Sequence, residues 1–250
     1  MRDRFTKISA LTVRNLKEIL RDPLSLIFML ALPLFMEILF YFLFHGMTSQ
    51  FEMKYFAPGI VVFSQTFLTL FAGLLISMDR STAFLTRLYV SGAKSFDFIA
   101  GYLLALLPIA VIQSILFFLV GGMIDPSIFS ASMILSALMS LIPSLFFISL
   151  GILFGSVCNE KSVGGISSIA ITGQSLLSGM WFPVDSMKSG FLTAMKCLPF
   201  KNATVVVQNV LTGISDPFAD LWSPLLILLG YVVVIFTAAV LVFGSKMKAK

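Results

Sequence analysis

The chain has 250 residues, of which 58% are hydrophobic and only 12% are charged, and its mean hydropathy is +1.00. This composition lies far outside the range of soluble globular domains and indicates an integral membrane protein. The formal net charge of +5 comes mostly from Lys and Arg residues that flank apolar segments, so it gives no indication of nucleic-acid binding.

The first predicted element is an amphipathic helix over residues 5–21. At 100° per residue its charged side chains share one face, and its apolar side chains share the opposite one: Phe5, Ile8, Leu16, Ile19 and Leu20. A helix of this kind is expected to lie in the cytoplasmic interface of the membrane. Asp22 then caps the first span, and Pro23 takes its first position.

Six apolar runs are each long enough to cross a hydrocarbon core of about 30 Å as a helix. They are residues 24–44, 57–77, 98–122, 131–156, 163–181 and 223–243. Helices are expected because lipid offers no partner to unpaired backbone groups, and because the runs lack the alternation of a barrel strand. The predicted fold is an all-α integral membrane protein with one transmembrane domain over residues 1–250.

Lys and Arg predict the orientation. Of these 17 residues, 13 lie in the amino-terminal segment, the 78–97 loop, the 157–162 turn and the carboxy-terminal tail. The other four are Lys54, Lys188, Lys196 and Lys201. By the positive-inside rule both termini and the 78–97 loop are cytoplasmic. Cys158 and Cys197 then lie on opposite sides of the membrane, which excludes a disulfide between them.

Polar side chains at membrane depth are candidates for a transport pathway. Glu37 lies one turn after Pro33 in the first span, and an intramembrane carboxylate is a functional candidate by default. The alternative is a protonated or hydrogen-bonded group that stabilises helix contacts. The other pathway candidates are Gln65, Thr69, Gln113, Thr172 and Gln174.

The fourth span carries small residues at a spacing that lets helices approach closely. Serines recur at every fourth position, and two glycines follow: Ser136, Ser140, Ser144, Gly151 and Gly155. This pattern predicts tight packing against a neighbouring helix.

The 182–222 segment is neither a span nor a polar loop. Residues 184–197 and 200–211 form short apolar or amphipathic stretches on either side of Leu198-Pro199, and each is too short to cross. We expect a re-entrant helical hairpin on the extracytoplasmic side, before the last span. Asn202-Ala203-Thr204 matches a glycosylation acceptor, a pattern short enough to arise by chance.

The polar segment between the second and third spans is itself patterned as a helix. Asp79 or Ser81 can cap its start, and Gly92 can supply a left-handed end. Ser95 can then cap the next helix, with Asp97 in the first turn. Apolar residues recur at helical spacing: Phe84, Leu85, Leu88 and Tyr89. This segment is either a surface offered to a soluble partner or a solvated loop on the lipid headgroups.

Five motifs follow one another in a recognisable order. They are Arg21-Asp22-Pro23, Ala57-Pro58-Gly59-Ile60, the run from Asp79 to Leu88, Gly179-Met180-Trp181-Phe182-Pro183, and Leu198-Pro199 with Asn202. With the helical pattern around them, they resemble the permease subunit of ABC transporters of the ABC-2 type, over essentially the whole chain. Among these, the chain looks more like the drug and antibiotic exporters than the glycan exporters.

In that family the first cytoplasmic loop is a coupling helix that docks in a groove of the ATPase subunit. It usually contains a Glu-Arg-Gly-Thr-Leu-Glu run, from which this sequence departs at Asp79, Ser81 and Thr86. The resemblance implies that the coupling residues are Asp79, Arg80, Phe84, Leu85, Arg87, Leu88, Tyr89 and Gly92.

The resemblance also implies the partners. These are two copies of an ABC ATPase subunit that bind ATP and Mg, a second permease copy in a homodimer or heterodimer, and the bilayer of a bacterial cytoplasmic membrane. The sequence contains no G-x-x-x-x-G-K-[ST] motif and no Ser-His-acid or Cys-His set, so we expect neither catalysis nor a metal site in this chain.

The predicted function is outward transport of an amphiphilic cargo such as a drug, antibiotic, lipid or glycan. Two alternatives stay open. One is a secondary transporter or channel that works without ATP and uses Glu37, and the other is a membrane assembly subunit that transports nothing itself. Against the first alternative, the chain has no duplicated halves and a single ionisable group at membrane depth.

Overall fold

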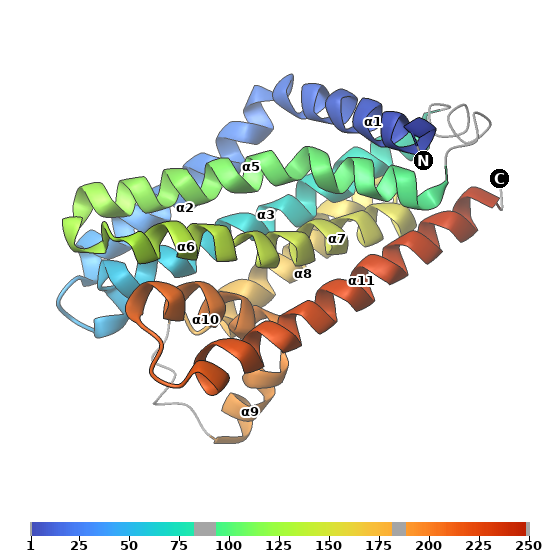
Figure 1. Cartoon of the computed structure of the whole chain (residues 1–250). Coiled ribbons are helices and arrows are strands. Elements are labelled where there is room, and N and C mark those ends of the chain that lie inside the picture. Colours follow the sequence, from blue (N-terminus) through green and yellow to red (C-terminus); the bar gives the residue numbers. More distant parts are fainter. Residues whose placement is uncertain (1, 83–93, 182–188, 249–250) are drawn as a thin grey trace.

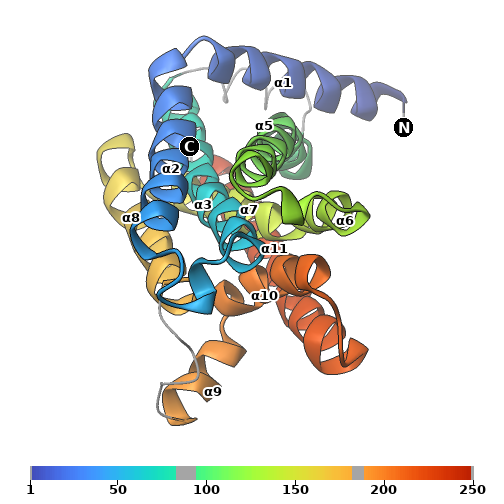
Figure 2. The same ribbon diagram turned by 90° about the vertical axis from the view of Figure 1, so that its left-hand side faces the viewer.

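The computed structural model describes residues 2–82, 94–181 and 189–248. These residues fold into helices packed side by side, and the described residues contain no strand (Figures 1 and 2). The last turn of α3 (Met53–Ser81) and the first turn of α5 (Ser95–Ile124) lie at the same end of the bundle, which we call the junction end. Helix α2 (Pro23–Phe44) leads to the opposite end, where α3 begins.

The other helices fill the bundle in chain order: α1 (Arg2–Leu20), α6 (Ala131–Met139), α7 (Leu141–Val157), α8 (Glu160–Leu177), α9 (Ser189–Cys197), α10 (Pro199–Thr212) and α11 (Ser223–Lys248). Short 3-10 turns lie at Ser49–Phe51 (η1) and Pro126–Ile128 (η2), and a π-helical stretch at Pro217–Trp222 (η4) leads into α11.

Five stretches are long and apolar enough to cross a membrane: Pro23–Phe44, Met53–Ser81, Ser95–Ile124, Ala131–Val157 and Pro217–Lys246. They match five of the six predicted spans. The sixth, 163–181, corresponds to α8, which is not among them. Its charged start and its Gly, Ser, Thr and Gln residues lower its hydropathy.

Helix α8 nevertheless returns along α3. It follows α7 after a short turn at the junction end and then packs along α3 (Figure 1). Val163 near its start meets Gly73, and Met180 just beyond its end meets Gly59. As the chain proceeds along α8, it meets lower-numbered residues of α3. The two helices are therefore antiparallel.

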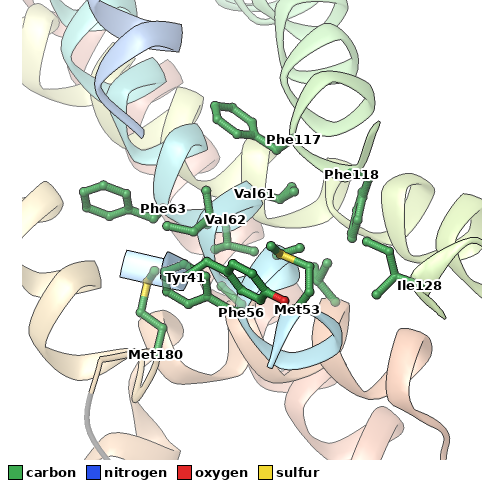
Figure 3. Close-up of a cluster of buried hydrophobic side chains, with 14 of the residues drawn as sticks. Tyr41, Met53, Phe56, Val61, Val62, Phe63, Phe117, Phe118, Ile128 and Met180 are labelled. Atoms are coloured by element: carbon green, nitrogen blue, oxygen red, sulfur yellow. The ribbon is translucent and has the colours of Figure 1, made fainter. Parts of the chain in front are cut away.

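Helix α3 is the centre of the bundle, with α2, α5, α7, α8 and α10 packed on it. Most of its side chains are buried, although Phe67, Phe71 and Met78 along one face are partly exposed. One apolar cluster lies near the junction end, around Phe98 and Tyr102. A second lies at the opposite end, where Phe56 in the first turn of α3 belongs to one cluster with Phe117 and Met180 (Figure 3).

Helices α3 and α7 approach each other closely at two glycines of α7. A Cβ added at Gly151 would overlap the Thr69 carbonyl, and one added at Gly155 would overlap the Gly73 carbonyl. The Thr69 hydroxyl donates to the Phe147 carbonyl at 3.0 Å. The predicted tight packing therefore occurs, with backbone lying directly against backbone.

Two of the matched spans differ from the prediction in detail. The fourth, Ala131–Val157, consists of two helices, α6 and α7, because Pro143 has no N–H for the Met139 carbonyl and the helix breaks at Ser140. The second extends beyond residues 57–77 at both ends, from Met53 to Ser81. Asp79 therefore lies in the last turn of α3 and does not cap a new helix.

Two short helices occupy the predicted hairpin region, with Leu198 between them. The side-chain amide of Asn202 in α10 donates to the carbonyls of Lys196 and Leu198 at 2.8 and 2.6 Å. These bonds satisfy the end of α9. Asn202 is only 5% exposed, so it is not accessible to a glycan and the match to a glycosylation acceptor was chance.

Candidate functional site

A buried carboxylate joins three helices at the junction end. Asp79 of α3 is 3% exposed. Arg14 of α1 holds it with both terminal nitrogens, from Nη1 to Oδ2 and from Nη2 to Oδ1 at 2.7 Å. Tyr102 of α5 donates its hydroxyl to Oδ2 at 2.5 Å. We call Arg14, Asp79 and Tyr102 the Asp79 cluster.

The electrostatics of the Asp79 cluster favour a charged Arg14. Burial lowers the pKa of its guanidinium, but the hydrogen bond and the negative charge of Asp79 outweigh burial and raise the pKa above the ordinary value. Arg14 also pairs with Glu18 at 2.5 Å, one turn further along α1. A guanidinium that meets a carboxylate with two parallel bonds has the geometry in which this pair is strongest.

A second ion pair holds the start of α5 to α1. Arg4 donates from Nε to Asp97 Oδ1 at 2.5 Å, and Asp97 is 2% exposed. The other oxygen of Asp97 accepts the backbone N–H of Lys94 at 3.0 Å. The carboxylate thus closes the first turn of α5, and Ser95, the predicted cap, is simply the first residue of the helix.

Arg80 points away from the Asp79 cluster, toward α7. Its guanidinium donates to the carbonyls of Gly155 and Cys158 at 2.6 and 3.2 Å. Carbonyls at a helix end have no partner within the helix, so Arg80 satisfies the end of α7 from outside it. Adjacent residues of α3 therefore bond to α1 and α5 on one side and to α7 on the other.

A concave surface lies beside Arg80. It encloses about 590 Å³ between the end of α3 and the turn from α7 to α8. Its lining includes Ser77, Ser81, Asn159, Glu160 and Lys161. Asn159 caps α8 by accepting the N–H of Ser162 at 2.9 Å, so the turn is shaped by its own sequence.

Of the predicted coupling residues, the structure places Asp79 and Arg80. The others, Phe84, Leu85, Arg87, Leu88, Tyr89 and Gly92, lie outside the described residues. Their docking role stays a prediction.

Two predicted pathway residues, Gln65 and Gln113, make buried hydrogen bonds inside the bundle. The Gln65 amide donates to the hydroxyls of Ser114 and Ser140 at 3.2 and 3.1 Å. The Gln113 amide donates to the Ser64 carbonyl at 3.1 Å. All five side chains are fully buried apart from a 1% exposure of Ser114, so in this conformation they join α3 to α5 and to the α6–α7 break.

The remaining pathway candidates are dispersed. Thr69 bonds to α7, and Gln174 donates to the Thr204 hydroxyl of α10 at 2.8 Å. Thr172 alone is exposed, on the outer face of α8. Glu37 is fully buried, and neither carboxylate oxygen has a hydrogen-bond partner among the described residues. A Cβ added at Gly121 of α5 would lie 3.2 Å from Oε1 of Glu37, so the carboxylate packs closely against α5.

An aromatic pocket of about 550 Å³ opens between α2, α3 and α8 near the opposite end. Its walls are almost wholly apolar and include Phe40, Phe44, Phe51, Phe63 and Trp181. The rings of Phe40 and Trp181 lie 4.5 Å apart between centroids. The Trp181 indole N–H donates to Ser175 Oγ at 2.9 Å, so one polar group is fixed beside the aromatic walls.

The family assignment rests on the sequence between residues 6 and 212. Over that range, from α1 to the end of α10, the chain matches the family model described as ABC-2 type transporter. The chain belongs to this family. No curated protein matches it in sequence.

In the ABC-2 family this domain is the transmembrane permease component, which generally works with an ABC ATPase partner and is not itself catalytic. The predicted family is thus confirmed, and with it a multi-pass membrane protein. Sequence reasoning missed Arg4, Arg14 and Tyr102. Arg14 was assigned only to the charged face of the amino-terminal helix, Arg4 was counted only toward the orientation, and Tyr102 lay within an apolar run. One signal was present: the carboxylates Asp79 and Asp97 lie at the two boundaries of the polar segment.

Proposed function

We propose that this chain is the membrane-spanning subunit of an ATP-driven exporter that moves an amphiphilic cargo outward. ATP and Mg would be bound by two copies of a separate ATPase, and a second permease copy would complete the transporter in a bacterial cytoplasmic membrane. The observation that carries the proposal is the junction end, where Asp79, Arg80 and Asp97 attach the boundaries of the predicted coupling segment to α1, α5 and α7. Boundaries anchored in this way would let the segment between them pass force to the spans.

The path of the chain supports six spans with both termini on one side. Helix α8 has 18 residues, a length of about 27 Å at 1.5 Å per residue, and it runs antiparallel to α3. The first and last described helices both reach the start of α5, because Arg4 of α1 bonds to Asp97 and Phe243 of α11 packs on Phe98. An even number of crossings accounts for this arrangement, and α9 with α10 would then form the extracytoplasmic hairpin.

The two native cysteines test this orientation. Cys197 in α9 is exposed and Cys158 follows α7 at the junction end. In intact cells a membrane-impermeant maleimide should label a Cys158→Ser variant, which keeps Cys197, and should not label a Cys197→Ser variant. In permeabilised cells both single variants should be labelled. The double variant, Cys158→Ser with Cys197→Ser, should be labelled in neither kind of cell. The reverse pattern in intact cells would invert the topology.

The aromatic pocket supports an amphiphilic cargo, because apolar walls with one fixed polar group suit a molecule of mixed character. Phe40→Ala should remove a ring that contacts Trp181, Phe44 and Phe51. Loss of such contact area should weaken cargo affinity by about tenfold, measured as the concentration for half-maximal transport. Phe42→Ala is the matched control, since this ring is 71% exposed on the same helix. Equal effects of both variants would contradict a cargo role for the pocket.

Glu37 is expected to act in packing rather than as a proton carrier, since the described residues place no ionisable partner beside it. Glu37→Gln keeps the shape and removes the titratable group. Transport should stay within about tenfold of wild type, whereas loss of an essential proton-transfer group typically costs about 100-fold or more. Transport should be measured in vesicles with ATP or with a proton gradient alone. Collapse of transport in the variant, together with transport driven by the gradient alone in wild type, would favour the secondary-transporter alternative.

The central test is reconstitution. The chain should co-purify with an ABC ATPase, cargo transport in proteoliposomes should require ATP, and amphiphilic compounds should stimulate hydrolysis. Deletion of the gene should increase sensitivity to amphiphilic antibiotics. A wild-type chain that retains no ATPase, or that transports without ATP, would contradict the proposed function.

A further inference from the structure

Helix α1 contacts α3 and α5 through two arginines, and the two contacts have the same construction. In each, an arginine of α1 meets a carboxylate that is almost fully buried: Arg14 meets Asp79 at the end of α3, and Arg4 meets Asp97 at the start of α5. The two arginines are ten residues apart, which is about 15 Å along a helix. Helix α1 therefore bridges the ends of two spans that are adjacent in sequence (Figure 2).

Between Arg4 and Arg14, helix α1 also packs closely against α5 through an apolar side chain. Leu11 is 5% exposed, and its Cβ would lie 2.8 Å from a Cβ added at Gly101 of α5. Phe5 and Leu20, by contrast, are 77% and 56% exposed. The packed face of α1 is thus defined by Arg4, Leu11 and Arg14 rather than by its most apolar residues.

The two ion pairs fix the position of α1 relative to the ends of α3 and α5. An almost fully buried carboxylate is costly without a cationic partner, so each Asp holds its Arg in one place. Tyr102 adds a further donor to Asp79, and Arg80 beside it fixes the same turn to α7. The end of α3 cannot move toward or away from α1 without breaking the bidentate pair.

We propose that α1 is a clamp in which Arg14 and Arg4 are positioning residues for energy coupling. They hold the ends of α3 and α5 in a fixed relation, so that force applied by a cytoplasmic ATPase reaches both spans together. This inference rests on the proposed function. It goes further by assigning the coupling role to two ion pairs of α1, a helix otherwise expected only to lie in the membrane interface.

The test uses the reconstituted complex with its ATPase. Arg14→Gln should leave ATPase recovery within about twofold of wild type and lower cargo-stimulated hydrolysis roughly three- to thirtyfold, the usual range for residues that carry coupling. The double variant Arg14→Asp, Asp79→Arg should restore part of that loss, since the opposite charges still meet. Lys17→Gln removes the same charge from the exposed face of α1 and should change nothing.

Two further variants keep the outcome decisive. If Arg14→Gln is not recovered from membranes, Arg4→Gln is judged by the same criterion, because Arg4 is about half exposed and its loss perturbs packing less. Tyr102→Phe should give a smaller loss of stimulation with normal recovery. Wild-type stimulation in a recovered Arg14→Gln or Arg4→Gln protein would overturn the clamp. Failure of the wild-type chain to bind any ATPase would instead overturn the proposed function.

Discussion

Gly151→Val should abolish accumulation of the folded protein. A side chain at this position would overlap the Thr69 carbonyl, and neither backbone can rotate away as a side-chain rotamer could. Overpacking of a core typically costs about 1 to 3 kcal/mol, and we expect at least the upper value here because the obstacle is main chain. The measurement is the amount of protein that survives detergent extraction as a monodisperse peak, with its thermal midpoint.

Gly165→Ala is the control for that experiment. Gly165 lies in α8 with nothing within 4 Å of an added Cβ, so a methyl group fits and raises helix propensity. This variant should accumulate like wild type. Normal yield and midpoint for Gly151→Val would show that α3 and α7 are not in backbone contact.

The double variant Leu85→Asp, Leu88→Asp should uncouple ATP hydrolysis from transport. Both residues belong to the apolar set at helical spacing that the family resemblance assigns to ATPase docking. Burial of a large apolar side chain is worth about 1.5 to 3 kcal/mol, and two charges in a modest interface should remove most of its affinity. Retention of the ATPase on affinity-tagged permease, together with cargo-stimulated hydrolysis, measures the effect.

Insertion of the double variant is checked by the labelling of Cys197, which should be unchanged. Gly92→Val offers a contrast, since it would penalise a left-handed helix end and leave the apolar set intact. Wild-type coupling in a correctly inserted double variant would refute the docking assignment. The turn around Asn159, Glu160 and Lys161, which borders the concave surface beside Arg80, would then be the next candidate.

The sequence predicted the helices well and their contacts unevenly. Apolar runs of sufficient length identify spans because lipid imposes one solution on the backbone. The spacing of Gly151 and Gly155 predicted close packing because small residues four positions apart let two helix backbones approach each other. In contrast, the polar content of α8 leaves it outside the set of helices that composition supports as spans, so a crossing by residues 163–181 stays a prediction.

The partners of charged residues could not be predicted. Arg14 and Lys17 both belong to the polar face of α1, yet only Arg14 turns toward α3, since a helical wheel fixes directions but not neighbours. Asp79 was expected to begin a helix, a role that an aspartate in a turn commonly takes. Its actual role depends on Arg14 and Tyr102, which are 65 and 23 residues away in sequence.

The glycine contacts between α3 and α7 also restrict the motions available during a transport cycle. If α7 slid along α3 by one residue, Leu150 or Ile152 would meet Thr69 in place of Gly151, and the two backbones would be forced apart. A slide by a whole turn, about 5.4 Å, would keep one glycine in register but would break the bonds from Arg80 to Gly155 and Cys158. The two helices should therefore travel as one rigid body. Changes in shape should fall to α2 and α11, the least enclosed of the helices that could cross the membrane.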